Sequence, residues 1–144
     1  MPTYLPFVVT AATLALNAST HGTPAAVVVN RAAGSTLVLP AAYGSGAEFD
    51  IMVGTTITSN NLIIQVANSS DVMTGNCVML QDAGDTVAGF ETAADTDTIT
   101  MNGSTKGGIR GDRILLKDIA NNTWQVQIIA AGTGTEVTPF SATV

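Results

Sequence analysis

The residue types that could support catalysis are scarce in this chain, and their spacing follows no catalytic motif. His21 is the single histidine and lies in the turn STHGTP. A nucleophile needs a base within hydrogen-bond reach, and the base needs an orienting partner. A Ser-His-Asp site is arithmetically possible, but the sequence has no G-x-S-x-G, H-E-x-x-H or paired C-x-x-C motif. We therefore expect neither an enzyme nor a zinc site.

Carboxylates are the second group that could do chemistry, and they gather in residues 82–97. This stretch, DAGDTVAGFETAADTD, holds five acids and no base. A glycosidase needs one pair of carboxylates about 5 to 10 Å apart. The DTD at 95–97 has oxygen ligands that suit calcium, but the rest of an EF-hand loop is missing. We interpret the stretch as a solvated loop without metal or cofactor, with those two sites as alternatives. The five acids are Asp82, Asp85, Glu91, Asp95 and Asp97.

Positive charge gathers in TITMNGSTKGGIRGDRILLKD, residues 98–118, which holds four of the five basic residues. The glycines resemble those of a phosphate loop. A P-loop, however, needs Lys at the position of Ile109 and a helix after the loop, whereas RILLKD alternates like a strand. The RGD at 110–112 is too short a match to indicate integrin binding. We expect the four basic residues to contact a neighbouring subunit: Lys106, Arg110, Arg113 and Lys117.

Complementary charge gives this hypothesis its physical basis. Residues 82–97 are acidic, whereas the four bases of residues 106–118 face only Asp112 and Asp118 in their own segment. In a symmetric oligomer the basic loop of one subunit would meet the acidic loop of the next, which sets register more than affinity. The alternative is local surface pairs, which contribute about 0 to 1 kcal/mol each.

Composition indicates an assembly protein. The chain has 144 residues, a formal charge of −6, only 11% charged residues and 46% hydrophobic residues. The acidic balance argues against nucleic acid, whose binding depends on Lys and Arg that neutralise phosphates, and against an anionic membrane surface. A weakly charged surface offers little opposition to contact between copies. We therefore expect a homo-oligomer or a subunit of a larger particle.

The single cysteine and the N-terminal segment carry no targeting signal that we recognise. Cys77 is the only cysteine, so no disulfide forms within the chain, and we expect a small buried hydrophobic residue. The apolar N-terminal stretch has no basic residue before Arg31, and Pro6 interrupts it, so we read it as mature protein. No apolar run approaches the roughly 20 residues that span a bilayer.

Apolar residues alternate with a period of two along most of the chain, which is typical of half-buried strands. Three segments, 48–53, 62–67 and 124–129, show the alternation most clearly. Each is expected to direct one apolar set into the core. The inward sets are Phe49, Ile51 and Val53; Leu62, Ile64 and Val66; and Trp124, Val126 and Ile128.

Turn signals separate the strands and indicate an all-β fold. We expect two antiparallel hairpins, one around NRAAGS at 30–35 and one around Asn121-Asn122. Eight to ten short strands of this kind predict an antiparallel β-sandwich or jelly-roll-like module. It should form a single domain over residues 13–144. Further strands are expected at 13–17, 78–81, 86–90 and 98–101.

Residues 1–12, MPTYLPFVVTAA, do not alternate well and contain two prolines. One interpretation is an edge strand that lies on its own sandwich. The other is an N-terminal arm that docks on a neighbouring subunit or partner, with Tyr4, Leu5 and Phe7 as anchors of the hot-spot type.

Several short blocks of the sequence resemble sequence motifs of one protein family. They are LPAAYGSG, VGTTITSNN, QVANSSDVMTG and TITMNGSTKGG, and the resemblance extends over residues 34–144. In these blocks the chain is similar to small virion proteins of tailed phages that infect aquatic bacteria, including cyanophages.

This resemblance implies a structural protein on a phage particle. The first expectation is a capsid decoration, or cement, protein that is made in the host cytoplasm, binds the major capsid protein on the capsid exterior and bridges its subunits. Trimers at three-fold positions are the first expectation for its oligomer, and dimers the second. The alternative is a tail-fibre or spike module that binds a receptor or carbohydrate, for which the loop aromatic Tyr43 in AAYGSG is the candidate contact.

Overall fold

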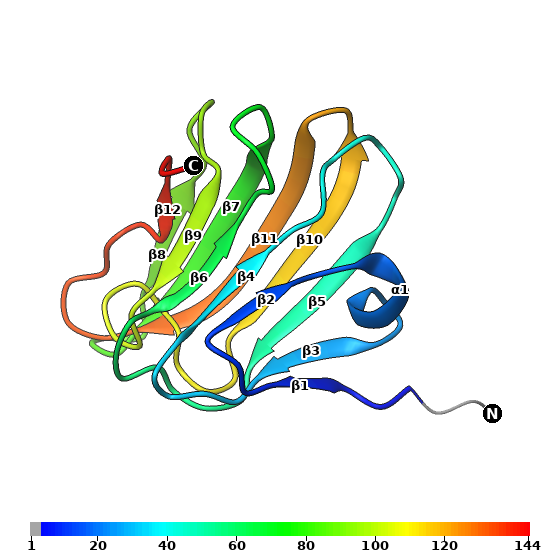
Figure 1. Ribbon diagram of the computed structural model, residues 1–144. Coiled ribbons are helices and arrows are strands. Elements are labelled where there is room, and N and C mark those ends of the chain that lie inside the picture. Colours follow the sequence, from blue (N-terminus) through cyan, green and yellow to red (C-terminus); the bar gives the residue numbers. More distant parts are fainter. Residues whose placement is uncertain (1–3) are drawn as a thin grey trace.

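The computed structural model describes residues 4–144 and folds them into two packed β-sheets (Figure 1). The larger sheet has seven strands in the order β1-β3-β5-β10-β11-β7-β8, and the smaller has five in the order β12-β9-β6-β4-β2. The larger sheet contains β1 (Phe7–Val9), β3 (Ala26–Val29), β5 (Glu48–Val53), β7 (Val72–Gln81), β8 (Val87–Glu91), β10 (Arg113–Ala120) and β11 (Thr123–Gly132). The smaller contains β2 (Thr13–Ala15), β4 (Ser35–Val38), β6 (Leu62–Gln65), β9 (Thr98–Met101) and β12 (Phe140–Ser141).

The first six strands wind between the two layers. Strands β1, β3 and β5 lie parallel in the larger sheet, and β2, β4 and β6 lie parallel in the smaller one. Neighbouring parallel strands need a crossover between them. Here a strand of the opposite sheet provides each crossover, so every loop in this half connects the two layers. A short helix, α1 (Ala18–His21), lies between β2 and β3.

The second half of the chain contains the expected hairpin. Strands β10 and β11 pair antiparallel around Asn121 and Asn122, and Asn122 adopts a φ of 60°. Asparagine tolerates this left-handed conformation better than most residues do. The hairpin lies in the middle of the larger sheet, with β5 on one side and β7 on the other.

The all-β sandwich is confirmed, but two details of the expected pairing are wrong. The sheets are mixed, with five parallel and five antiparallel pairings, and are not antiparallel throughout. The segment at 30–35 makes no hairpin, because β3 and β4 belong to different sheets. Alternation and turn residues indicate that the chain turns, but they do not indicate which sheet the next strand joins. The jelly-roll connectivity is not confirmed.

The predicted inward faces form the core. Phe49, Ile51, Leu62, Ile64 and the other residues of the three inward sets are all at most 2% exposed. Trp124 is fully buried, and its ring centroid lies 5.8 Å from that of Phe49. The period-two alternation therefore identified correctly which side chains fill the space between the sheets.

The N-terminal segment enters the larger sheet as its edge strand. β1 pairs with β3, Val9 is buried, and the ring of Phe7 packs edge-on against His21 with centroids 4.4 Å apart. Before β1 the chain extends away from the sheets (Figure 1). Tyr4 and Leu5 are 58% and 78% exposed there. Residues 1–3 of the expected arm lie outside the described residues.

One close approach between central strands needs glycine. Gly75 of β7 faces Val126 of β11 at a φ of 153°, and a Cβ at Gly75 would lie 1.8 Å from the Val126 carbonyl oxygen. That contact is with backbone, so it cannot be relieved by a side-chain rotation. Gly89 in the neighbouring strand β8 has no atom within 4 Å of the corresponding position.

These two glycines make a matched pair of variants. Gly75→Ala is expected to lower the free energy of unfolding by at least about 2 kcal/mol, because β7 or β11 must shift. Gly89→Ala is expected to change it by less than about 0.5 kcal/mol. Urea unfolding followed by Trp124 fluorescence measures both. Equal effects of the two substitutions would contradict the observed pairing of β7 with β11.

Candidate interaction surface

Asp118 is a buried carboxylate that holds a loop. It lies near the end of β10, is 1% exposed, and accepts hydrogen bonds from the backbone N–H groups of Tyr43, Gly44 and Ser45 and from the Ser45 hydroxyl, at 2.7 to 3.2 Å. Burial alone would raise the pKa of Asp118. The hydrogen bonds from Ser45, Gly44 and Tyr43 together outweigh it, so the pKa lies below its ordinary value. The β4–β5 loop is thereby fixed to β10.

Asp112 has the same role at the other end of β10. Its Oδ2 accepts the N–H groups of Gly108 and Ile109 at 2.8 and 3.0 Å, and its Oδ1 accepts that of Ala131 at 2.9 Å. Burial raises the pKa of Asp112 despite these bonds, which act in the opposite direction. The carboxylate ties the glycine-rich loop before β10 to β11.

Two further buried aspartates complete the pattern. Asp71 accepts the Ala42 N–H at 2.9 Å and the side-chain amide of Asn122 at 2.8 Å. Asp97 accepts the Thr143 N–H at 2.8 Å, which ties the C-terminal segment to the start of β9. Asp97 was expected in a solvated loop, and that expectation is wrong for this residue because its carboxylate faces inward to the C-terminal backbone.

The stability of the protein should depend on Asp118 in a pH-dependent way. A lowered pKa in the folded state stabilises the protein above the unfolded value of about 3.9, and this contribution disappears as the pH falls through the folded value. We expect Asp118→Asn to lower the free energy of unfolding at pH 7 by about 1.5 to 3 kcal/mol, since buried donors lose a charged acceptor.

Urea unfolding from pH 7 to pH 3 measures this effect. The difference in the free energy of unfolding between wild type and Asp118→Asn is expected to become smaller below about pH 4. Asp95→Asn removes an exposed carboxylate and serves as the control, with an expected change below about 0.5 kcal/mol. If that difference in the free energy of unfolding stayed constant from pH 7 to pH 3, the stabilising role of the Asp118 charge would be contradicted.

The glycines of residues 102–112 shape a tight loop. Gly103, Gly107, Gly108 and Gly111 all have positive φ, and a Cβ at Gly103 would lie 1.8 Å from the Ile57 carbonyl oxygen. The Asn102 side chain accepts the N–H groups of Ser104 and Lys106 at 2.9 and 3.0 Å. The glycine content therefore reflects the packing of this loop against its own fold.

The four expected basic contact residues do not form one site. Arg113 makes a bidentate ion pair with Asp50, both bonds at 2.8 Å, and Lys117 lies 2.9 Å from Glu48. Both acids are on the adjacent strand β5 and not in residues 82–97. Glu48 is the register partner of Lys117, and Asp50 lies two residues from Met52, the register partner of Arg113. The interaction with Lys117 lowers the pKa of Glu48. Within residues 4–144, Lys106 and Arg110 make no ion pair.

Arg110 lies close to the edge strand. A hollow of about 410 Å³ is lined by Val8 of β1, Val28 of β3, Met52 of β5 and Arg110. The structure brings Arg110 next to Val8 of the N-terminal segment, but the predicted anchors Tyr4, Leu5 and Phe7 do not line this hollow. The hollow itself was not predicted, because the sequence does not show that β1, β3 and β5 are neighbours.

The outward face of the larger sheet carries exposed aliphatic side chains. We define the outer patch as Val78 and Leu80 of β7, Val87 of β8, Leu115 of β10 and Ile129 of β11. Ile129 is 63% exposed, Val87 55%, Leu80 52% and Val78 41%, whereas their neighbours along each strand point inward. Such side chains mark an interaction surface when they are contiguous.

Register makes the outer patch contiguous. Val78 is the partner of Ile129, and Leu80 is the partner of Val87. A hollow of about 170 Å³ lies beside Ile129, with Val78, Arg113 and Leu115 among its lining residues. The outer patch therefore combines projecting side chains with a depression.

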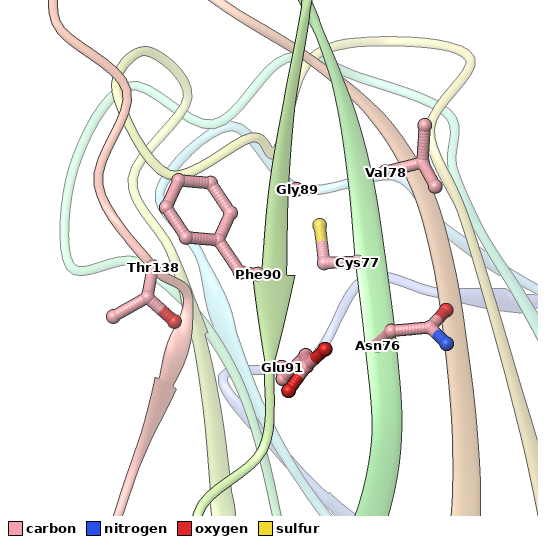
Figure 2. A pocket seen from close by; sticks show the side chains of 7 residues that line it. All are labelled: Asn76, Cys77, Val78, Gly89, Phe90, Glu91 and Thr138. Carbon is pink, nitrogen blue, oxygen red and sulfur yellow. The ribbon is translucent and has the colours of Figure 1, made fainter.

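A larger open hollow of about 570 Å³ borders the outer patch where β7 and β8 meet (Figure 2). Gly89 has no side chain to cover the β8 backbone there. Val78 and Asn76 lie on one side of the hollow, and Phe90 and Thr138 lie on the other.

Cys77 is buried as expected, and burial together with the nearby Asp112 charge raises the pKa of its thiol to about 12. A protonated thiol is a poor nucleophile.

The remaining chemical groups form no cluster in the described part of the chain. His21 is 3% exposed at the end of α1, and burial lowers its pKa. Among residues 4–144, no three His, Cys, Asp or Glu side chains are grouped so that they could hold a metal ion. The helix in the described residues is too short to cross a membrane.

No known family model, curated protein or solved structure matches this chain.

Proposed function

We propose that this chain is a structural phage protein that decorates the exterior of the capsid and contacts the major capsid protein. The observation that carries the proposal is the exposed Tyr4–Leu5 segment, which leads into the edge strand β1, where Val8 and Arg110 line one hollow. The sequence resemblance to virion proteins over residues 34–144 gives the class of particle. A cement protein needs surface that buries well against a partner and does not need a reacting group.

The N-terminal segment has the properties of an anchor. Tyr4 and Leu5 lie just before β1, an edge strand that pairs only with β3 among residues 4–144. Large aromatic and aliphatic side chains dominate binding energy when a partner buries them. An edge strand also offers backbone groups that a partner strand can pair with.

The basic residues divide into two groups in this proposal. Arg113 and Lys117 are already paired with Asp50 and Glu48 on the surface. Arg110 lines a hollow with Val8 of β1, so it is the basic residue best placed to meet an acidic group of the capsid near the edge strand. Lys106 belongs to the same loop, whose backbone Asn102 and Asp112 fix.

Binding to capsids that lack this protein tests the proposal. Wild type is expected to saturate at a fixed ratio to the capsid subunit. Tyr4→Ala combined with Leu5→Ala is expected to weaken binding at least tenfold, because it removes both anchors. The thermal melt should stay unchanged, since both side chains are exposed. Deletion of residues 1–9 is a poorer test, because it would remove β1 and the buried Val9.

Tyr43→Ala is the matched control, because Tyr43 is 71% exposed but lies on the β4–β5 loop. It is expected to bind capsids as wild type does. Absence of capsid binding by wild type, or undiminished binding by the Tyr4 and Leu5 double variant, would contradict the proposal.

The second candidate function is carbohydrate recognition at the host surface. One observation favours it: the Tyr43 ring is exposed while Asp118 fixes its backbone, which makes a preformed aromatic platform. A glycan array distinguishes the two candidates. Glycan binding that Tyr43→Ala abolishes, together with no capsid binding, would favour a tail-fibre or spike module.

A further inference from the structure

The outer patch takes no part in the capsid contacts proposed for Tyr4, Leu5 and Arg110. It also differs from the rest of the surface in charge. The chain has a formal charge of −6. On the face that carries the patch, Arg113 and Lys117 neutralise Asp50 and Glu48. The other acids lie at its margin: Glu91 in β8 opposite Asn76, and Asp82 and Asp85 in the β7–β8 turn. An acidic copy that approaches this face therefore meets little repulsion.

We propose that the outer patch pairs with the outer patch of a second copy of this chain, which gives a two-fold dimer in which the two larger sheets pack face to face. The inference goes beyond capsid binding and does not depend on it. Identical faces that meet in this way form an isologous contact, which closes at two copies. A trimer, the first expectation from the resemblance, needs two different surfaces.

The shape of the outer patch supports a second copy of the chain as its partner. Ile129 projects from the middle of the face, and the hollow of about 170 Å³ beside it is lined by Val78 and Leu115. In a two-fold contact each copy offers one projecting Ile129 and one hollow. Packed sheets interdigitate side chains in this manner about 10 Å apart. Gln125 and Gln127 of β11 continue the face beyond Ile129 and supply a polar rim.

The size of the face predicts a reversible dimer. Strands β7, β8, β10 and β11 are about 4.8 Å apart and rise about 3.3 Å per residue, so the face measures roughly 20 Å by 25 to 30 Å. Two copies would bury about 1,000 to 1,200 Å² in total, the lower limit for specific interfaces. We therefore expect a concentration-dependent equilibrium between monomer and dimer.

Light scattering and sedimentation velocity over a wide concentration range test the inference. Wild type is expected to approach twice the mass of the 14.7 kDa chain at high concentration. Ile129→Glu is expected to raise the dissociation constant at least tenfold, because it places two acidic groups in the contact. Arg113 is the register partner of Ile129, so the folded monomer should tolerate the new carboxylate.

The controls separate loss of contact from loss of fold. Val137→Thr matches Val78→Thr in chemistry and exposure, 44% against 41%, but lies outside the sheets and should leave the dimer unchanged. If Ile129→Glu fails to fold, the conservative double variant Val78→Thr with Ile129→Thr decides, since threonine keeps the strand preference.

Three results would overturn the inference. They are a monomer at every concentration, a mass of three chains, and a dimer that both outer-patch variants leave intact. Capsid binding by a monomeric protein would refute the dimer while the proposed function stood. A stable dimer that does not bind capsids would refute the proposed function alone.

Discussion

Buried carboxylates that accept loop amides are the interaction on which the rest of this structure depends. The chain crosses between two sheets at most of its connections, and each crossing leaves backbone donors near the ends of the core. Unpaired buried donors cost about 1 to 3 kcal/mol each. Asp71, Asp97 and Asp118 accept these donors from segments that are distant in sequence, and Asp112 accepts them from its own loop and from β11. The sandwich therefore closes through buried carboxyl acceptors as well as through apolar burial.

Fixed loops also determine what the surface presents. Asp118 holds the backbone that carries the exposed ring of Tyr43, and Asp112 holds the loop that carries Arg110. Both side chains therefore project from backbone that is already ordered before a partner binds, which reduces the entropic cost of contact. The Tyr4–Leu5 segment differs, because no carboxylate among the described residues holds its backbone. The anchoring role that we propose for this segment would therefore require ordering on the partner.

Sequence patterns predicted local features well and long-range pairing poorly. The inward position of Trp124 and the hairpin at Asn121-Asn122 followed from alternation and turn residues, because both depend on nearby residues. The parallel winding did not, since alternation is the same in parallel and antiparallel strands. The role of Asp118 was not predicted either, because nothing in the neighbouring sequence shows that residues 43–45 lie against it. The outer patch depends on the pairing of β11 with β7, which the sequence does not reveal.

We infer that buried carboxylates make the crossing loops of this β-sandwich as stable as its sheets. Amide hydrogen exchange by NMR tests this claim most directly. The amides of Gly44, Gly108 and Thr143 are predicted to exchange only through global unfolding, as core strands do, whereas Gly84 in the β7–β8 turn exchanges rapidly. Exchange of the first three amides at the rate of Gly84 would contradict the account.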